Sequence, residues 1–153
     1  MKIATLAIIV QENRVLLGYK KKGEIGAQTL NGPGGKCEPD ETLEECVIRE
    51  TNEEVGITLH EKDLNKTAVI TFFAADKPDF EVHVFWTDTF DGVPIETIDM
   101  IPNWYDIDKV PYEKMLDSDR TWFAKAINRE TFRANVYYKH RAKEFERIEF
   151  LSY

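Results

Sequence analysis

Residues 35–57 of the 153-residue chain read GKCEPDETLEECVIRETNEEVGI, and this stretch decides how the rest of the sequence is interpreted. Thr42 with Glu45 three residues later has the form of a capping box, and Leu43 opens an apolar segment with helical periodicity. Gly56 stands where a left-handed C-terminal cap is expected. The stretch therefore predicts a short loop followed by a helix that begins at Leu43 and ends at Gly56.

Three glutamates near the end of this predicted helix lie away from its polar face. On a wheel of about 100° per residue, Glu50 and Glu54 fall along the buried arc marked by Leu43 and Val47, and Glu53 borders it. Carboxylates three and four residues apart repel one another, and the helix dipole disfavours negative charge at this end. The alternative is that these glutamates simply lie at a helix end exposed to water, but their angles on the helical wheel argue against it. The cluster predicts a divalent cation with oxygen ligands, Mg²⁺ or its near substitute Mn²⁺.

A loop rich in glycine and proline precedes the helix. Residues 31–35 read NGPGG, which predicts irregular backbone because both residue types interrupt helices and strands. Carboxylate-held metals beside such a loop and a lysine are typical of phosphoryl chemistry. The loop is not a Walker A motif, because Leu30 stands at the position of its first glycine and Cys37 at that of its final Ser or Thr.

Strand patterns dominate the rest of the chain. Two apolar runs around a polar turn predict an N-terminal hairpin, and later runs are rich in β-branched and aromatic residues. We expect an α+β architecture in one domain, residues 1–153, with a mixed or antiparallel sheet and two helices packed on it. The expected strands are residues 3–10, 15–17, 67–73, 81–88, 103–105, 132–138 and 145–152, and the second expected helix lies around residues 122–127.

Composition restricts the class of partner. The chain has 20 Lys and Arg against 28 Asp and Glu, a formal net charge of −8, which argues against binding to duplex nucleic acid or to an anionic membrane. Cys37 and Cys46 are the two cysteines, and their spacing fits neither a zinc site nor a disulfide framework. We therefore expect free thiols in a reducing compartment, the cytoplasm. We also expect a monomer or a small homo-oligomer.

The stretch 35–57 resembles the Nudix box, G-x5-E-x7-R-E-U-x-E-E-x-G-U, where U is aliphatic. Thr51 is the one departure, and its methyl group can serve at the edge of the buried arc. The resemblance implies an α/β/α sandwich, with a mixed sheet between helices, and a Mg²⁺-dependent hydrolase of nucleoside diphosphates linked to another moiety. The matching fixed positions are Gly35, Glu41, Arg49, Glu50, Glu53, Glu54 and Gly56.

The resemblance also implies roles for individual residues. Glu53 or Glu54 would be the catalytic base, and which one differs within the family. Asp99 matches an acidic loop residue that can approach the metal, although a solvated loop acid is the alternative. Structural roles fall to Gly35, Gly56 and the pair Glu41 and Arg49, which would brace the loop against the helix. The implied metal ligands are Glu50, Glu53, Glu54 and the carbonyl of Gly34.

Beyond the box, the chain looks like the branch that converts 8-oxo-dGTP or 2-hydroxy-dATP to the monophosphate and pyrophosphate. The branch carries a tryptophan and an aspartate pair in its base-recognition loop, and Leu116, Ser118 and Asp119 stand at the matching places, so discrimination is expected to be reduced or redirected. Asp119 could instead cap the second helix, and Asn31 could form an Asx turn. The implied nucleotide-site residues are Thr5, Lys20 and Asn31, with Pro33, Gly34, Gly35 and Lys36 along the phosphates.

Other functions remain open from the sequence. A Nudix hydrolase of this kind could act instead on ADP-ribose, a dinucleoside polyphosphate or an RNA 5′ end, and the lack of a basic stripe disfavours the last. A Nudix-like domain could also sense a nucleotide without hydrolysing it, but a sensor does not need three intact metal carboxylates. We therefore expect a small-molecule nucleotide substrate.

Overall fold

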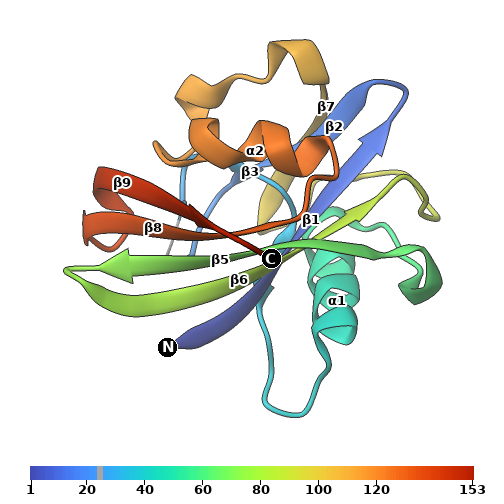
Figure 1. Cartoon of the computed structure of the whole chain (residues 1–153). Coiled ribbons are helices and arrows are strands. Elements are labelled where there is room, and N and C mark those ends of the chain that lie inside the picture. Colours follow the sequence, from blue (N-terminus) through green and yellow to red (C-terminus); the bar gives the residue numbers. More distant parts are fainter. Residues whose placement is uncertain (24–25) are drawn as a thin grey trace.

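The computed structural model describes residues 1–23 and 26–153, and shows a curled sheet with a helix on each side (Figure 1). Within the described residues the strands are β1 (Lys2–Gln11), β2 (Arg14–Lys20), β3 (Leu30–Asn31), β4 (Gly34–Lys36), β5 (Asn65–Ala74), β6 (Lys77–Thr87), β7 (Met100–Asp106), β8 (Phe132–His140) and β9 (Lys143–Leu151). The helices are α1 (Leu43–Val55) and α2 (Asp119–Ile127), with short 3-10 turns at Glu61–Asp63, Ile107–Lys109 and Tyr112–Lys114. The predicted α+β class is confirmed.

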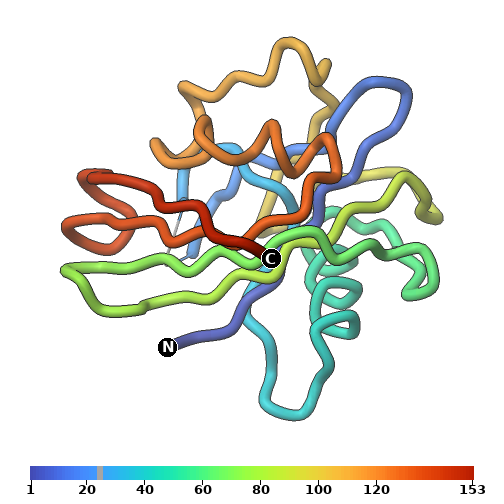
Figure 2. Tube along the Cα trace, viewed as in Figure 1, coloured from blue at the N-terminus to red at the C-terminus, as the bar shows by residue number. Residues whose placement is uncertain are grey.

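The sheet is mixed. Its order through the described residues is β3-β2-β1-β6-β5-β8-β9, while β4 pairs with β1 and β7 with β2. The β1–β6 and β5–β8 pairs are parallel and the remaining pairs antiparallel. In the β1–β6 pair, Thr5 lies opposite His83 and Leu6 opposite Val84, so the start of the chain runs beside its middle (Figure 2).

Helix α1 has the predicted boundaries. Thr42 and Glu45 form the capping box, each side chain accepting a hydrogen bond from the other residue's backbone N–H at 3.0 and 2.8 Å. Gly56 caps the C-terminus with φ of 77°, in the left-handed region that glycine adopts without strain. The buried residues of the helix include Val47 and Glu54, which confirms that Glu54 lies on the apolar arc.

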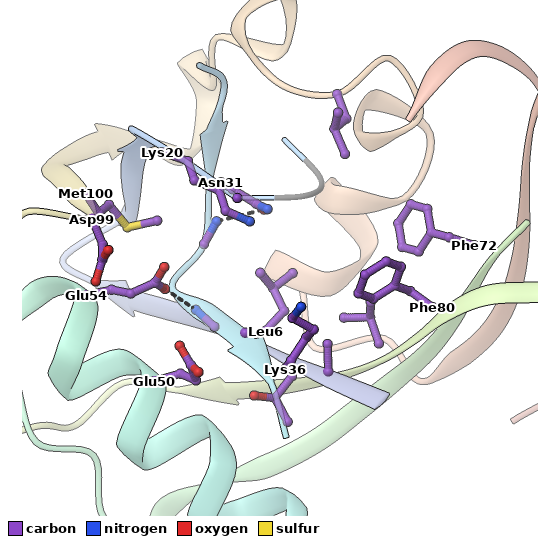
Figure 3. A pocket seen from close by; sticks show the side chains of 18 of the residues that line it. Leu6, Lys20, Asn31, Lys36, Glu50, Glu54, Phe72, Phe80, Asp99 and Met100 are labelled. Carbon is purple, nitrogen blue, oxygen red and sulfur yellow. Dashed lines mark hydrogen bonds between the residues drawn. The ribbon is translucent and has the colours of Figure 1, made fainter. Parts of the chain in front are cut away.

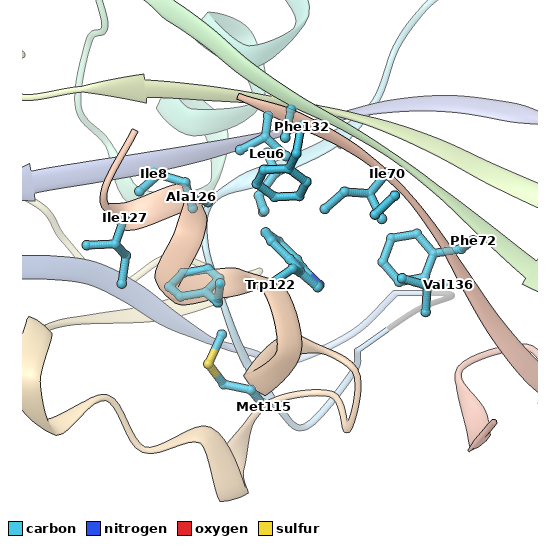
Figure 4. Close-up of a cluster of buried hydrophobic side chains, with 14 of the residues drawn as sticks. Leu6, Ile8, Ile70, Phe72, Met115, Trp122, Ala126, Ile127, Phe132 and Val136 are labelled. Atoms are coloured by element: carbon cyan, nitrogen blue, oxygen red, sulfur yellow. The ribbon is translucent and has the colours of Figure 1, made fainter. Parts of the chain in front are cut away.

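Two hydrophobic cores lie on opposite sides of the sheet, because alternate residues of each strand face opposite ways. On the α2 side, Trp122 packs among Leu6, Ile70 and Phe132 (Figure 4). On the α1 side, the core is formed by Val47 and Val55 of α1 with Ala7, Ile9, Leu16, Ile57, Leu59, Phe85 and Met100. Strand β1 supplies both cores and so fixes the two helices relative to one another.

One local prediction is wrong, and one of the alternatives left open is excluded. Irregular backbone was expected throughout residues 31–35, yet Gly34 and Gly35 belong to β4 and pair with Leu6 and Thr5 of β1. Asp119 does not cap α2. It is the first helical residue, its carboxyl is buried, and the cap position is held by Ser118, which makes no side-chain capping hydrogen bond.

No helix within residues 1–23 or 26–153 combines the length and the apolar character needed to cross a membrane.

Candidate active site

A cavity of about 420 Å³ is lined by residues of β1, β4, β6, α1 and α2, among others. Glu50 and Glu54 project into one end from α1, and Phe72 and Phe80 lie at the far end (Figure 3). The cavity thus joins an acidic end, beside the glycine-rich loop, to an apolar end.

Glu54 is held in a defined position at the acidic end. Its Oε1 accepts a hydrogen bond of 2.7 Å from the Gly34 N–H, and only 7% of the residue is exposed. Burial raises the pKa of Glu54 to about 7, opposed by the Gly34 N–H and by Lys20, and reinforced by the negative charges of Glu50 and Asp99. The carboxyl can therefore exchange a proton near neutral pH.

Glu50 lies one turn earlier on the same face. Burial raises its pKa, opposed chiefly by a hydrogen bond from Arg49. Its carboxylate lies against Gly35, so close that a Cβ at that position would be 2.5 Å from Glu50 Oε2. The loop backbone and the two carboxylates are therefore packed together without space for another side chain.

Arg49 ties the loop to the helix. Its guanidinium donates to both carboxylate oxygens of Glu41, to Glu50 Oε1 at 2.9 Å and to the Lys36 carbonyl at 3.2 Å. The hydrogen bonds from Arg49 hold the pKa of Glu41 down to about 2. Because the guanidinium contacts the loop on one side and Glu50 on the other, it fixes the distance between them.

Glu53 is placed differently from its two neighbours. Its side chain is 54% exposed, accepts a 3.3 Å hydrogen bond from Arg49 and does not line the cavity. Its predicted role as metal ligand or base stays a prediction. Asp99 does line the cavity, and its Oδ1 lies 3.4 Å from the Nζ of Lys22.

The donors at this end fit a divalent cation. Buried carboxylates repel one another and lose hydration, and the raised pKa values of Glu50 and Glu54 record that cost. Oxygen donors gathered on one face are the kind that hard divalent cations prefer. A bound cation would stabilise both carboxylates in their charged forms.

A buried acid lies at the other end of the cavity. Asp119 is 2% exposed, and burial raises its pKa to about 7, partly offset by the Leu116 backbone and the Trp122 indole. Ser118 is turned away: it accepts a 3.0 Å hydrogen bond from the Tyr138 hydroxyl and donates its backbone N–H to the same oxygen. The structure thus brings Asp119, but not Ser118, to the cavity wall.

Most of the predicted nucleotide-site residues come together. Asn31 lines the cavity while its Oδ1 accepts the N–H of the next residue, Gly32, at 2.9 Å. The alternative Asx turn does not form, because the residue two positions on, Pro33, has no N–H. Pro33 does not line the cavity, and its carbonyl accepts the Ala7 N–H. The predicted residues on the wall are Thr5, Lys20, Asn31, Gly34, Gly35, Lys36, Glu50, Glu54, Asp99, Leu116 and Asp119.

Sequence reasoning missed part of the apolar wall. Leu6, Phe80, Val82, Met100 and Trp122 all line it. Residues 80 and 82 share one face of a strand, so two-residue alternation could have grouped them with Leu6 once the β1–β6 pairing was known.

A family model described as NUDIX domain matches residues 1–126. The chain belongs to the Nudix family. It is 41% identical over 132 residues to an oxidized purine nucleoside triphosphate hydrolase of Danio rerio and 36% identical to the Mus musculus protein of that name, in each case covering 86% of this chain and 83% of the relative. The predicted resemblance to the Nudix superfamily and to this branch is confirmed.

The Nudix fold is also found in solved structures. A MutT protein from Bacillus halodurans superposes with a TM-score of 0.83 at 21% identity, over 98% of this chain and 97% of that one. A MutT Nudix hydrolase from Burkholderia pseudomallei gives a TM-score of 0.63 at 28% identity, over 72% and 86%. The arrangement of a mixed sheet between helices is therefore that of the family.

Proposed function

We propose that this Nudix protein is a Mg²⁺-dependent pyrophosphohydrolase that converts oxidised purine nucleoside triphosphates to the monophosphate and pyrophosphate, and so cleans the nucleotide pool. One observation carries the proposal: a single cavity joins the paired carboxylates Glu50 and Glu54 to an apolar slot that ends in the buried acid Asp119. The names of the Danio rerio and Mus musculus relatives support this substrate class.

The acidic end would carry out the hydrolysis. Glu50, Glu54, Asp99 and the Gly34 carbonyl, with Glu53 from the outer side of the helix, would hold Mg²⁺. When bound, Mg²⁺ supplies charge neutralisation for the phosphates and lowers the pKa of a coordinated water. Glu54 or Glu53 would accept the proton of the attacking water.

The loop and its lysines would position the triphosphate. Lys20 and Lys36 line the cavity, and Lys20 is close enough to lower the pKa of Glu54. Lysine presents a flexible point charge with three donors, which suits phosphate oxygens that move during an in-line displacement. Lys20 and Lys36 would neutralise phosphate charge on the side of the triphosphate that faces away from α1.

The apolar end would select the base. Phe72, Phe80 and Trp122 offer apolar contact to the faces of a purine. Asp119, with a pKa of about 7, can donate a hydrogen bond when neutral and accept one when charged. Because Ser118 is turned toward Tyr138, this one carboxyl would read the base edge where the branch has two.

A substrate panel tests the proposal directly. The protein with Mg²⁺ should hydrolyse 8-oxo-dGTP and 2-hydroxy-dATP faster than dGTP and dATP, releasing pyrophosphate and the monophosphate, with products identified by mass spectrometry. Discrimination among the purine triphosphates is expected to be reduced or redirected relative to the branch, since Leu116 supplies no stacking face. Turnover confined to ADP-ribose, a dinucleoside polyphosphate or capped RNA, or tight nucleotide binding without product, would contradict the proposal.

Asp119→Asn is expected to lower kcat/KM for 8-oxo-dGTP by roughly tenfold to a hundredfold, about 1–3 kcal/mol, because a buried hydrogen-bonding group that loses its match is costly. The amide cannot change its protonation state, so the pH dependence of the preference between 8-oxo-dGTP and 2-hydroxy-dATP should flatten. Asp117→Asn is the matched control, since its exposed side chain does not line the cavity. Equal effects of the two substitutions on base preference would refute the role of Asp119.

We also keep the expectation of a cytoplasmic protein. Both cysteines are free thiols, which fits a reducing compartment.

A further inference from the structure

The two cysteines of the chain lie close together, between the end of β4 and α1. Cys37 follows β4 directly, and Cys46 lies on the buried face of α1. Their Sγ atoms and a carboxylate oxygen of Glu41 all lie within 4.8 Å of one another. Eight residues separate the cysteines in sequence, so the contact joins the loop that precedes the helix to the helix itself.

The two cysteine residues differ in their exposure to solvent. Cys46 is fully buried, and its Sγ donates to the Gly35 carbonyl at 3.6 Å and lies 3.3 Å from Thr5 Oγ1. Cys37 is partly exposed. A small oxidant can therefore reach Cys37 first, with the enclosed Cys46 thiol next to it.

We propose that Cys37 and Cys46 form a dithiol which hydrogen peroxide converts to an intramolecular disulfide, linking the segment that follows β4 to α1. The Cys37 thiolate attacks the peroxide oxygen, which breaks the O–O bond and gives a sulfenic acid and water. The Cys46 sulfur then attacks the Cys37 sulfur and expels the second water. Overall, two thiols and one hydrogen peroxide give one disulfide and two waters.

The surroundings make this reaction slow and its product persistent. Burial raises the pKa of both thiols, so little thiolate exists at neutral pH and oxidation should quicken as pH rises. Thiols whose thiolates are destabilised also form disulfides that are harder to reduce. The pair would therefore remain reduced under ordinary conditions and respond to sustained peroxide.

A thiophilic cation is the competing occupant of the same cluster. Both carboxylate oxygens of Glu41 are already bound to Arg49, and that guanidinium would repel a second positive charge nearby. Two neutral thiols in contact need no such rearrangement. The observations thus favour the disulfide over a metal site.

The effect on activity rests on the proposed function. Disulfide formation removes the thiol hydrogen that Cys46 donates to the Gly35 carbonyl. It also draws Cys37 toward α1, which shifts Gly34 and Gly35 of β4 relative to Glu50 and Glu54. A displacement of catalytic groups by about 1 Å can cost up to a hundredfold in rate. We expect kcat to fall by about tenfold on oxidation and to recover with dithiothreitol.

Tryptic mapping tests the disulfide independently of any substrate. No lysine or arginine lies between the cysteines, so both fall in the peptide of residues 37–49, CEPDETLEECVIR. After treatment with hydrogen peroxide and blocking of free thiols, this peptide should be two hydrogen atoms lighter and unlabelled. Cleavage after its internal glutamates should leave the fragments joined until they are reduced.

Cys37→Ser and Cys46→Ser serve as the variants. Neither can form the bond, and Cys37→Ser, whose side chain does not line the cavity, should keep its activity after peroxide treatment. A peptide that stays fully labelled, that carries sulfinic acid, or that appears only in cross-linked dimers would overturn the proposal. Protection of both thiols by one equivalent of Zn²⁺, with no disulfide on oxidation, would overturn it in favour of a metal site.

The activity readout separates two kinds of failure. If the disulfide forms but kcat on the active substrate is unchanged, the structural link stands and the effect on the loop is wrong. If no substrate is turned over at all, the peptide mass still decides the disulfide, and only the proposed function fails.

Discussion

Glu54→Gln should lower kcat for the preferred nucleotide by about 10²–10⁴-fold, the range expected when a general base is lost, while the fold stays intact. Glutamine keeps the length of the side chain and can still accept the Gly34 N–H, but it cannot accept a proton and is a weak ligand for a divalent cation. Steady-state kinetics with Mg²⁺ would measure the loss.

The same substitution should stabilise the metal-free protein at alkaline pH. The pKa of Glu54 is about 7 in the folded protein against 4.5 for an unperturbed glutamate, so folding favours its protonated form. As pH rises from about 4.5 to about 7, the unfolded chain releases the proton first, and stability falls by up to about 3 kcal/mol. Glutamine carries no charge and avoids that loss. Urea unfolding with EDTA should find the variant more stable at pH 8 and nearly unchanged at pH 4.

Glu53→Gln is the matched comparison. Glu53 lies in the same turn, but its side chain is half exposed, so its neutralisation should change stability little. Its effect on kcat decides which of the two glutamates is the base. Near-normal turnover in both variants would show that the acidic cluster is not the catalytic centre.

Features set by local sequence could be predicted. The ends of α1 follow from Thr42, Glu45 and Gly56, all within a turn of the boundaries they fix. The burial of Glu54 follows from its angle relative to Val47 on one helix. In such cases the interactions lie a few residues apart, and backbone geometry alone relates them.

Features set by distant pairing could not be predicted. Gly34 looked like part of an irregular loop because its partner, Leu6, lies far away in sequence. The position of Ser118 depends on the Tyr138 hydroxyl of β8, which turns it from the cavity and leaves Asp119 there. Period-two patterns identify the strands but not their neighbours, and the neighbours decide which side chains meet.

Gly34→Ala should destabilise the protein by about 3 kcal/mol, the upper part of the usual range for overpacking. A Cβ there would lie 2.0 Å from the Thr5 carbonyl oxygen and 2.9 Å from Leu6 Cα. These are backbone atoms of β1, which at these residues pairs on its other side with His83 and Val84 of β6 and so cannot move aside. The β4 segment must therefore separate from the sheet, and the hydrogen bond from Gly34 N–H to Glu54 is lost with it. Urea unfolding and kinetics together would measure both losses.

Gly35→Ala differs by one residue and should fail in another way. The three atoms nearest its Cβ would all belong to the Glu50 carboxylate, the carboxyl carbon at 2.5 Å, and a side chain can rotate away. We expect a stability change below about 1 kcal/mol, yet a large fall in kcat, because Glu50 leaves the position in which it faces Glu54. If both alanine variants lost the same free energy of unfolding, the contact between Gly35 and Glu50 would also be needed for the stability of the fold. If Gly35→Ala lost activity but kept its stability, while Gly34→Ala lost stability, the two glycines would have separate roles. Gly34 would then keep β4 paired with the sheet, and Gly35 would keep Glu50 in its catalytic position.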